Sequence, residues 1–168
     1  MKTNALPHFD DSVNTTGCCP KFNPDGWDVR NLHFQKKPFM RATTRSRNHV
    51  PLDMAEVFER VQRHMITAGA YDSDNCIVLS RDLSASQSEH LFSISKPVPE
   101  EEAITLSGDY VTKVFEGPYE KTKDWYTEME ELVRARGGEP TDVYFFYTTC
   151  PKCSDVYGHN YIIGVARI

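Results

Sequence analysis

The alternation of apolar and polar residues from residue 39 onward predicts two units of the same order, strand, helix, strand, strand. Helices are expected at 53–68 and 122–136, where apolar residues recur at the i, i+1, i+4, i+8 spacing of a one-sided amphipathic helix. Strands are expected at 40–49, 75–80 and 89–95 in the first unit, and at 108–116, 142–148 and 160–167 in the second.

The ends and the apolar faces of the two helices agree with this assignment. Asp53 followed by Glu56 resembles a capping box, and Gly69 and Gly137 come where the helices should stop. The apolar positions of the helices also match one to one: Val57 with Trp125, Phe58 with Tyr126, Val61 with Met129, and Met65 with Val133. This correspondence indicates an internal duplication.

Two tandem β-α-β-β units predict an α+β fold with one antiparallel sheet, both helices on one face and a concave opposite face. The repeats are expected at 39–98 and 104–168, within one domain of residues 39–168. Residues 1–38 contain four prolines and several large aromatic residues, which is typical of an extended arm that packs on the domain.

Composition narrows the class of partner. The chain has 168 residues, a formal net charge of −5 and 39% hydrophobic residues, so it should form a globular core and lacks the basic surplus of a nucleic-acid binder. No apolar run is long enough to cross a membrane, and no secretory signal is visible at the N-terminus. We therefore expect a cytoplasmic monomer or weak dimer without a cofactor, whose partner is a small molecule.

Aromatic residues concentrate in the second repeat. The strand at 142–148 is aromatic on both faces, so either Tyr144 and Phe146 or Phe145 and Tyr147 point away from the helices. One interpretation is a strand buried on both sides, with the arm as one cover. The other is an aromatic pocket wall, in which Tyr119, Trp125, Tyr144 and Phe146 would contact a flat or apolar ligand.

Glu116 is the predicted catalytic carboxylate. It ends a strand just before Gly117-Pro118-Tyr119, where a partly buried carboxylate could activate water, and Tyr147 or Tyr161 would stabilise the leaving oxygen. An exposed glutamate at the end of a strand is the alternative interpretation. Weaker candidates of the same kind are Glu120, Asp124, Glu128 and His159.

Four of the five cysteines lie near two proline-containing turns. Cys150 and Cys153 have the spacing of a two-ligand zinc knuckle, and Cys18 with Cys19 precedes a proline at the other end of the chain. Zinc binding and redox chemistry are both open, but adjacent cysteines rarely ligate one ion, so buried or capping thiols are the favoured interpretation. Cys76 is expected in the core.

The chain resembles the GyrI-like small-molecule-binding family over residues 39–168, through the duplicated unit and the segment from Phe115 to Tyr119 before a helix with Trp125. The segments 15–20 and 148–153 look like those of a stand-alone branch that is often labelled only as hydrolases. In sensors of the family a glutamate of the cleft opens the last strand, and Asn160 stands at the matching position here.

That resemblance implies two activities. Family members fused to DNA-binding domains sense drugs, and some stand-alone members resemble hydrolases that open cyclopropane rings of DNA-alkylating natural products. We therefore predict a protein that binds an apolar or aromatic small molecule in a cleft between the repeats, with hydrolysis as its enzymatic version. The alternatives are a binding or sequestering protein without chemistry and an interaction module held together by zinc.

Overall fold

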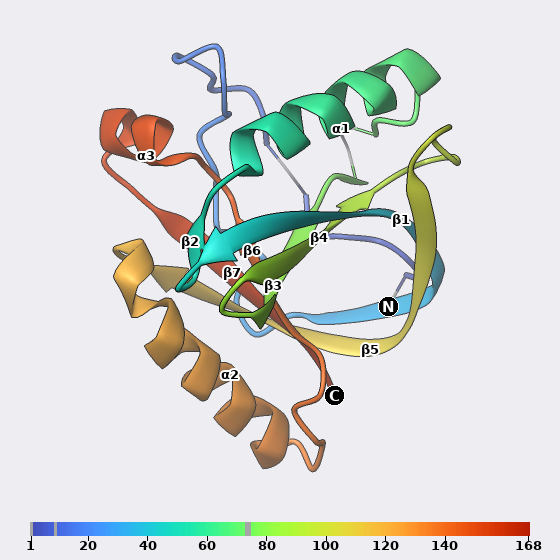
Figure 1. Cartoon of the computed structure of the whole chain (residues 1–168). Coiled ribbons are helices and arrows are strands. Elements are labelled where there is room, and N and C mark those ends of the chain that lie inside the picture. The colour runs from blue at the N-terminus through green and yellow to red at the C-terminus, as the bar shows by residue number, and fades with distance from the viewer. Residues whose placement is uncertain (1, 9, 73–74) are drawn as a thin grey trace. The chain divides into compact units, whose positions relative to one another are not determined.

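The computed structural model (Figure 1) describes residues 2–8, 10–72 and 75–168. The chain divides into two compact units. The terminal unit joins Met1–Phe34 to Gly108–Ile168, and the central unit is Gln35–Ser107. Two long strands run through both units, β1 (Asn31–Arg47) and β5 (Glu102–Glu116). Each unit has its own apolar core, so each is described by itself.

The described part of the central unit is an antiparallel set of strands with the α-helix α1. Its further elements are β2 (Val50–Pro51), α1 (Met54–Ala68), β3 (Val78–Ser84) and β4 (Gln87–Ser93). β4 lies between β1 and β3, and β2 pairs with the end of β1. The helix predicted at 53–68 is confirmed, and strands occur near the predicted positions. β1 begins at Asn31 rather than residue 40, and β3 covers 78–84 rather than 75–80.

Helix α1 buries the face that its periodicity predicts. Val57, Val61 and Met65 pack with Met40 and Phe92 in the core of the central unit. The helix ends at Gly69, whose φ of 61° places it in the left-handed region that favours glycine.

The start of α1 differs from the predicted capping box. The Asp53 carboxylate makes no cap hydrogen bond, and instead accepts hydrogen bonds from the backbone N–H of Arg45 at 2.7 Å and from its Nε at 3.0 Å. Asp53 therefore ties the start of the helix to β1.

The terminal unit holds the remaining elements. These are β5 from Gly108 onward, the short 3-10 helix η2 (Tyr119–Lys121), α2 (Thr122–Ala135), β6 (Val143–Tyr147), α3 (Pro151–Tyr157) and β7 (Tyr161–Arg167). β7 pairs with β5 on one side and with β6 on the other, both antiparallel. Helix α3 is a correction to the sequence pattern, which indicated no helix there.

Helix α2 packs on β6 and β7 through the predicted apolar positions Trp125, Met129 and Val133 (Figure 1). Gly164 in β7 permits this close packing, because a Cβ atom at that position would lie 2.5 Å from Sδ of Met129. The missing side chain therefore makes room for the helix.

The N-terminal segment covers one face of β6. Phe22 and Trp27 are buried, and their ring centroids each lie 6.0 Å from that of Phe146. The hydroxyl of Thr112 in β5 donates a hydrogen bond to the backbone carbonyl of Trp27. The structure therefore agrees with the interpretation of a strand that is buried on both sides. The N-terminal segment covers the side of the strand on which Phe146 lies.

The predicted fold class, an open GyrI-like sheet built from duplicated units, is wrong. The strand order is β2-β1-β4-β3-β6-β7-β5, and β1 also pairs with β5, the last strand of this order. The antiparallel sheet is closed, and its compact units do not follow the repeats. Hydrophobic periodicity predicts which face of an element is buried, but it carries no information on which strands pair.

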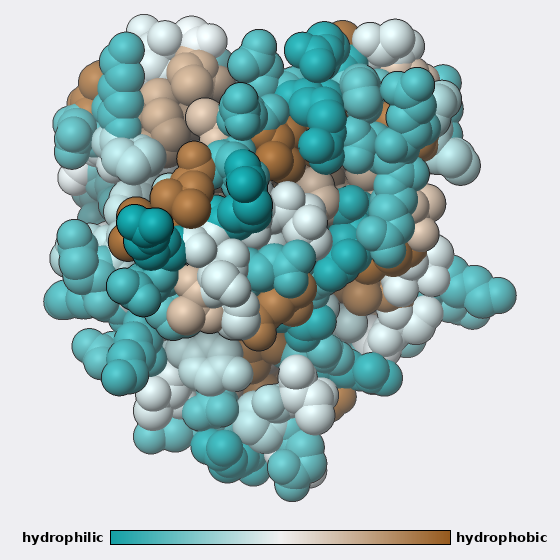
Figure 2. Space-filling view, in the orientation of Figure 1, coloured by the Kyte–Doolittle hydropathy of each residue, from teal (hydrophilic) through white to brown (hydrophobic). Residues whose placement is uncertain are grey.

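No helix in the described part of the chain is long and apolar enough to cross a membrane. On the face seen in Figure 2, hydrophobic residues lie as separate patches among hydrophilic ones.

Candidate functional site

A pocket of the terminal unit combines a carboxylate, a tyrosine and apolar surface. It measures about 490 Å³, and the residues that line it are Pro24, Asp25, Gly26, Asp28, Val114, Phe115, Glu116 and Tyr161. Glu116 is the last residue of β5 and lies directly opposite Tyr161, the first residue of β7. The strand register therefore places two of the predicted catalytic residues side by side.

His159, just before β7, pairs with Glu116. Its Nδ1 lies 2.8 Å from Oε1 of Glu116, and the two side chains are 44% and 50% exposed. The ionised carboxylate only accepts hydrogen bonds, so the neutral imidazole carries its proton on Nδ1 and presents Nε2 as a base. The pair therefore has the arrangement of a general base oriented by a carboxylate, in a place that substrate and water can reach.

Tyr161 stacks on this histidine. The two ring centroids are 5.3 Å apart and the rings are inclined by 13°. Burial, together with the charges of Glu116 and Asp25, raises the pKa of Tyr161 above its usual value, so its hydroxyl stays protonated at neutral pH. A protonated phenol at this position can donate a hydrogen bond to an oxygen of a bound molecule.

Hydrogen bonds hold both walls of the pocket in place. The side-chain amide of Asn160 donates to the carbonyl of Gly117 at 2.7 Å, which fixes the turn after Glu116. The carboxylate of Asp28 accepts the backbone N–H of Val114 at 3.0 Å and attaches the N-terminal segment to β5. Asn160, a predicted ligand-binding residue, thus acts on the backbone beside the pocket.

The other predicted aromatic ligand contacts lie elsewhere in the terminal unit. Trp125 of α2 stacks on Phe115 of β5, and Tyr144 and Phe146 are buried in β6. Tyr119 lies beside Tyr147, which was predicted as a catalytic residue, with ring centroids 5.9 Å apart. None of these five predicted residues is among the described residues that line the pocket with Glu116.

Sequence reasoning missed a second histidine cluster, in the central unit. His90 lies between the hydroxyl of Ser80, 2.7 Å from its Nδ1, and that of Thr44, 2.8 Å from its Nε2. Burial lowers the pKa of His90 to about 4, so the imidazole is neutral at physiological pH. The serine and histidine have the contact of a nucleophile and its base, but His90 is only 2% exposed. The alternation of the strands could have placed His90 on the same face as Phe92.

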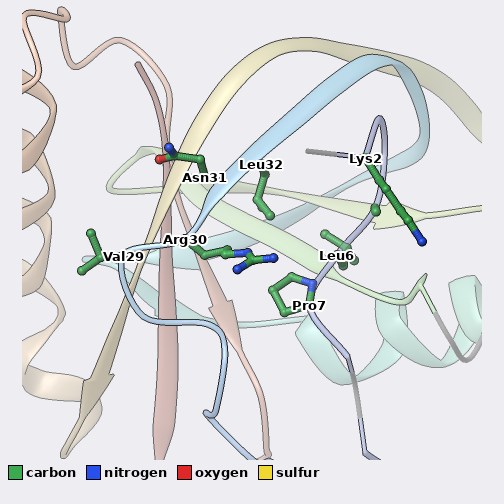
Figure 3. Close-up of a pocket in the computed structure, with 8 residues that line it drawn as sticks. Lys2, Leu6, Pro7, Val29, Arg30, Asn31 and Leu32 are labelled. Carbon is green, nitrogen blue, oxygen red and sulfur yellow. The ribbon is translucent and has the colours of Figure 1, made fainter.

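A larger pocket of about 750 Å³ lies between the N-terminal residues and the start of β1 (Figure 3). Its lining is apolar apart from Lys2, Arg30 and Asn31. In Figure 3 the guanidinium group of Arg30 extends toward Pro7, whereas Lys2 points away from it. None of the described residues in this lining is a carboxylate or a histidine, so Lys2 has no such partner there for acid–base catalysis.

The cysteines form the remaining chemical cluster. The sulfur atoms of Cys18, Cys19, Cys150 and Cys153 all lie within 4.8 Å of one another, although the two pairs come from opposite ends of the chain. A hydrogen bond with the Thr16 hydroxyl lowers the pKa of the Cys153 thiol to about 6, and burial raises the pKa of Cys19 to about 12. Cys76 lies outside this cluster, in the central unit.

Comparison with known proteins gives the class of the chain. The sequence model of the bacterial hydrolase family matches residues 9–168, nearly the whole chain, and the chain therefore belongs to that family. The match agrees with the predicted resemblance to a family branch that is labelled as hydrolases. It does not show a relationship to GyrI-like proteins. No curated protein matches the chain.

Proposed function

We propose that the protein hydrolyses a small neutral or cationic molecule, with His159 as general base and Glu116 as the residue that orients it. The observation that carries the proposal is the 2.8 Å contact between these side chains beside the pocket that Tyr161 lines. Membership of the bacterial hydrolase family supports the reaction class. The role of Glu116 thereby shifts from direct activation of water to positioning.

The reaction needs no group beyond these side chains and water. Nε2 of His159 takes a proton from a water molecule as the water oxygen bonds to the electrophilic carbon of the substrate. In an ester, the bond from that carbon to the leaving oxygen then breaks, and the leaving oxygen takes the proton from the imidazolium ring. In an electrophilic cyclopropane, a carbon–carbon bond of the ring breaks instead, its electron pair moves into the conjugated carbonyl group, and the oxygen of that group takes the proton. The hydroxyl of Tyr161 donates a hydrogen bond to the oxygen on which negative charge develops.

The lining of the pocket limits the substrate. Three of its side chains are carboxylates, and none of the described residues that line it is a cation, so an anionic substrate would be repelled. Pro24, Val114, Phe115 and the ring of Tyr161 provide apolar surface for an uncharged group. The predicted ligand class, an apolar or aromatic small molecule, fits this surface, and a strained cyclopropane ring is its most specific member.

The first experiment measures turnover of matched chromogenic substrates. Neutral and cationic aryl esters, an anionic aryl ester and an aryl phosphate are compared with an electrophilic cyclopropane that bears an aromatic group. We expect hydrolysis of a neutral or cationic member, and a much lower kcat/KM for the anionic ester with the same leaving group.

The second experiment compares two carboxylate variants. Glu116→Gln should lower kcat by at least about tenfold with little change in KM, because the imidazole loses its orientation but the pocket keeps its shape. Asp109→Asn is the matched control, since Asp109 pairs with His33 at 2.7 Å in the same unit but does not line this pocket. That variant should retain the wild-type rate.

Two results would overturn the proposal. If the folded protein binds an aromatic probe saturably and leaves every substrate intact after long incubation, it is a binding or sequestering protein. If substrates are hydrolysed and Glu116→Gln matches Asp109→Asn in kcat, the chemistry takes place at another site.

A further inference from the structure

The four clustered cysteines come from two short segments that the fold brings together. Cys18 and Cys19 follow Gly17 in a tight turn of the N-terminal segment, while Cys150 precedes α3 and Cys153 lies within it. Figure 1 shows the N-terminal segment beside α3. The hydroxyl of Tyr157 in α3 donates a 2.7 Å hydrogen bond to the carbonyl of Cys19, which fixes one segment against the other.

The spacing of the sulfur atoms suits one tetrahedral ion. A zinc ion with bonds of about 2.3 Å to four thiolates keeps each pair of sulfur atoms about 3.8 Å apart. Sγ of Cys18 lies 3.7 Å from Sγ of Cys19, and all four sulfur atoms are within 4.8 Å of one another. The objection that adjacent cysteines rarely share an ion is answered here by the conformation of the turn, which points both sulfur atoms to the same place.

The groups around the sulfur atoms also suit thiolates. The backbone N–H of Cys150 donates to Sγ of Cys19 at 3.5 Å, and the Thr16 hydroxyl lies 3.2 Å from Sγ of Cys153. Hydrogen-bond donors of this kind orient metal ligands and stabilise their negative charge. The N–H of Cys150 and the Thr16 hydroxyl belong to different segments, and each contacts a sulfur atom of the other segment. Each segment therefore stabilises a thiolate of the other.

We propose that Cys18, Cys19, Cys150 and Cys153 bind one Zn²⁺ ion in a tetrahedral four-thiolate site. On binding, the four thiols release four protons and form four Zn–S bonds, with no change in oxidation state. Four protein ligands leave no position for water, so the ion is structural and takes no part in hydrolysis. This proposal is independent of the proposed function.

The arrangement distinguishes this site from the other uses of cysteine. A redox pair needs two sulfur atoms, and packing alone does not require four thiols from opposite ends of a chain to converge, one of them exposed. The structural consequence is an anchor for the N-terminal segment. Directly after Cys19, this segment supplies Phe22 and Trp27, which cover β6, and then one wall of the pocket with Glu116.

The primary test is the metal content of the full chain, purified with a reducing agent and without chelators. We expect about one zinc per chain in wild type and in Cys76→Ser, which removes the one cysteine outside the cluster. Cys18→Ser should lose most of this zinc. Cys18 is exposed, so its substitution leaves the folded chain intact for the measurement.

A second measurement uses the wild-type chain alone, so it does not depend on the folding of any variant. The zinc-free wild-type chain is titrated with Co²⁺, and thiolate-to-cobalt charge transfer with the strong d–d bands of tetrahedral coordination should saturate at one equivalent. Added Zn²⁺ should bleach these bands. Limited proteolysis should cut the N-terminal segment faster in the zinc-free chain than in the zinc-loaded one.

Three results would overturn the proposal. The first is that the wild-type chain contains no zinc after purification and also gives no charge-transfer band with Co²⁺. The second is a mass loss that shows disulfides among these four cysteines in the freshly isolated, metal-free chain, which would make the cluster a redox site. The third is loss of zinc from Cys76→Ser to the same extent as from Cys18→Ser.

Discussion

His90 and His159 show how the same side chain takes two roles in one chain. Each imidazole is hydrogen-bonded on Nδ1, to the Ser80 hydroxyl for His90 and to the Glu116 carboxylate for His159. His90 is buried, and its second nitrogen is bonded to Thr44, whereas His159 is about half exposed beside a pocket. The first has the contacts of a structural residue and the second those of a base.

A Ser–His contact is not in itself a catalytic site, even in a family named for hydrolysis. A nucleophile must reach the substrate and a base must release the proton it takes. His90 satisfies two buried hydroxyl groups, and its ring packs at 5.0 Å against Phe58, so it completes the interior of the central unit. Access and a carboxylate partner separate the two histidines.

The largest expected effect is on turnover by His159→Gln. This variant should lower kcat/KM by about 10²–10⁴-fold, because glutamine keeps a polar side chain and loses the base. His33→Gln, in the exposed pair with Asp109, should leave kcat/KM within about twofold. Labelling with a fluorophosphonate, which reports an active serine, should leave Ser80 unmodified; modification of Ser80 would reverse the comparison.

The second effect is the loss of stability in acid. The pKa of His90 is near 4 in the folded protein and 6.5 in the unfolded chain. Between these pH values the unfolded chain binds a proton that the folded protein does not bind. The free energy of unfolding therefore has its full value above pH 6.5 and decreases as the pH falls, by about 3 kcal/mol at pH 4. Urea denaturation of wild type and of His90→Gln over this range measures it, and equal pH dependence of the two proteins would contradict it.

His90→Ala should have the third effect, a destabilisation of about 2–3 kcal/mol at pH 7. The substitution leaves the hydroxyls of Ser80 and Thr44 without this partner in a buried place and creates a cavity beside Phe58. The free energy of unfolding from denaturant titration tests this expectation. A change below about 0.5 kcal/mol would show that the network is not structural.

The smallest effect is that of Glu116→Gln on stability. The pair with His159 is exposed, and such pairs contribute about 0–1 kcal/mol, so the free energy of unfolding should fall by less than about 1 kcal/mol. Added salt should reduce the difference further. A loss comparable with that of His90→Ala would mean that Glu116 serves the fold rather than the chemistry.

The two main helices, and the presence and approximate position of the main strands, could be predicted from local patterns. The apolar spacing of Val57, Val61 and Met65 matches the buried face of α1, and the same holds for α2. The extent of β1 was missed because prolines and aromatic residues before residue 39 suggested an arm. Helix α3 was missed because Cys150-Pro151-Lys152-Cys153 indicated a knuckle, although proline is common in the first turn of a helix. Strand pairing is a long-range property that these patterns do not carry.

The candidate site was predicted in part. Glu116 was predicted from its position at a strand end, although as a partly buried carboxylate, whereas its side chain is 50% exposed. Tyr161 was predicted from the concentration of tyrosines in the second repeat, and the register of β5 with β7 brings the two residues together. His159 was considered only as a weaker alternative, since a turn histidine gives no sign of its partner. The aromatic residues Trp125 and Phe146 are buried by Phe115 and by the N-terminal segment, contacts that depend on segments distant in sequence.

The contact between the two cysteine segments also bears on how the chain is made. The Thr16 hydroxyl and Cys153 are 137 residues apart in sequence, so the segment with Thr16 is synthesised well before the segment that it contacts. The central unit, continuous from Gln35 to Ser107, needs no such delay. Until β6 has been synthesised, the large aromatic residues Phe22 and Trp27 lack the strand that they cover, and unburied apolar surface of this kind favours aggregation.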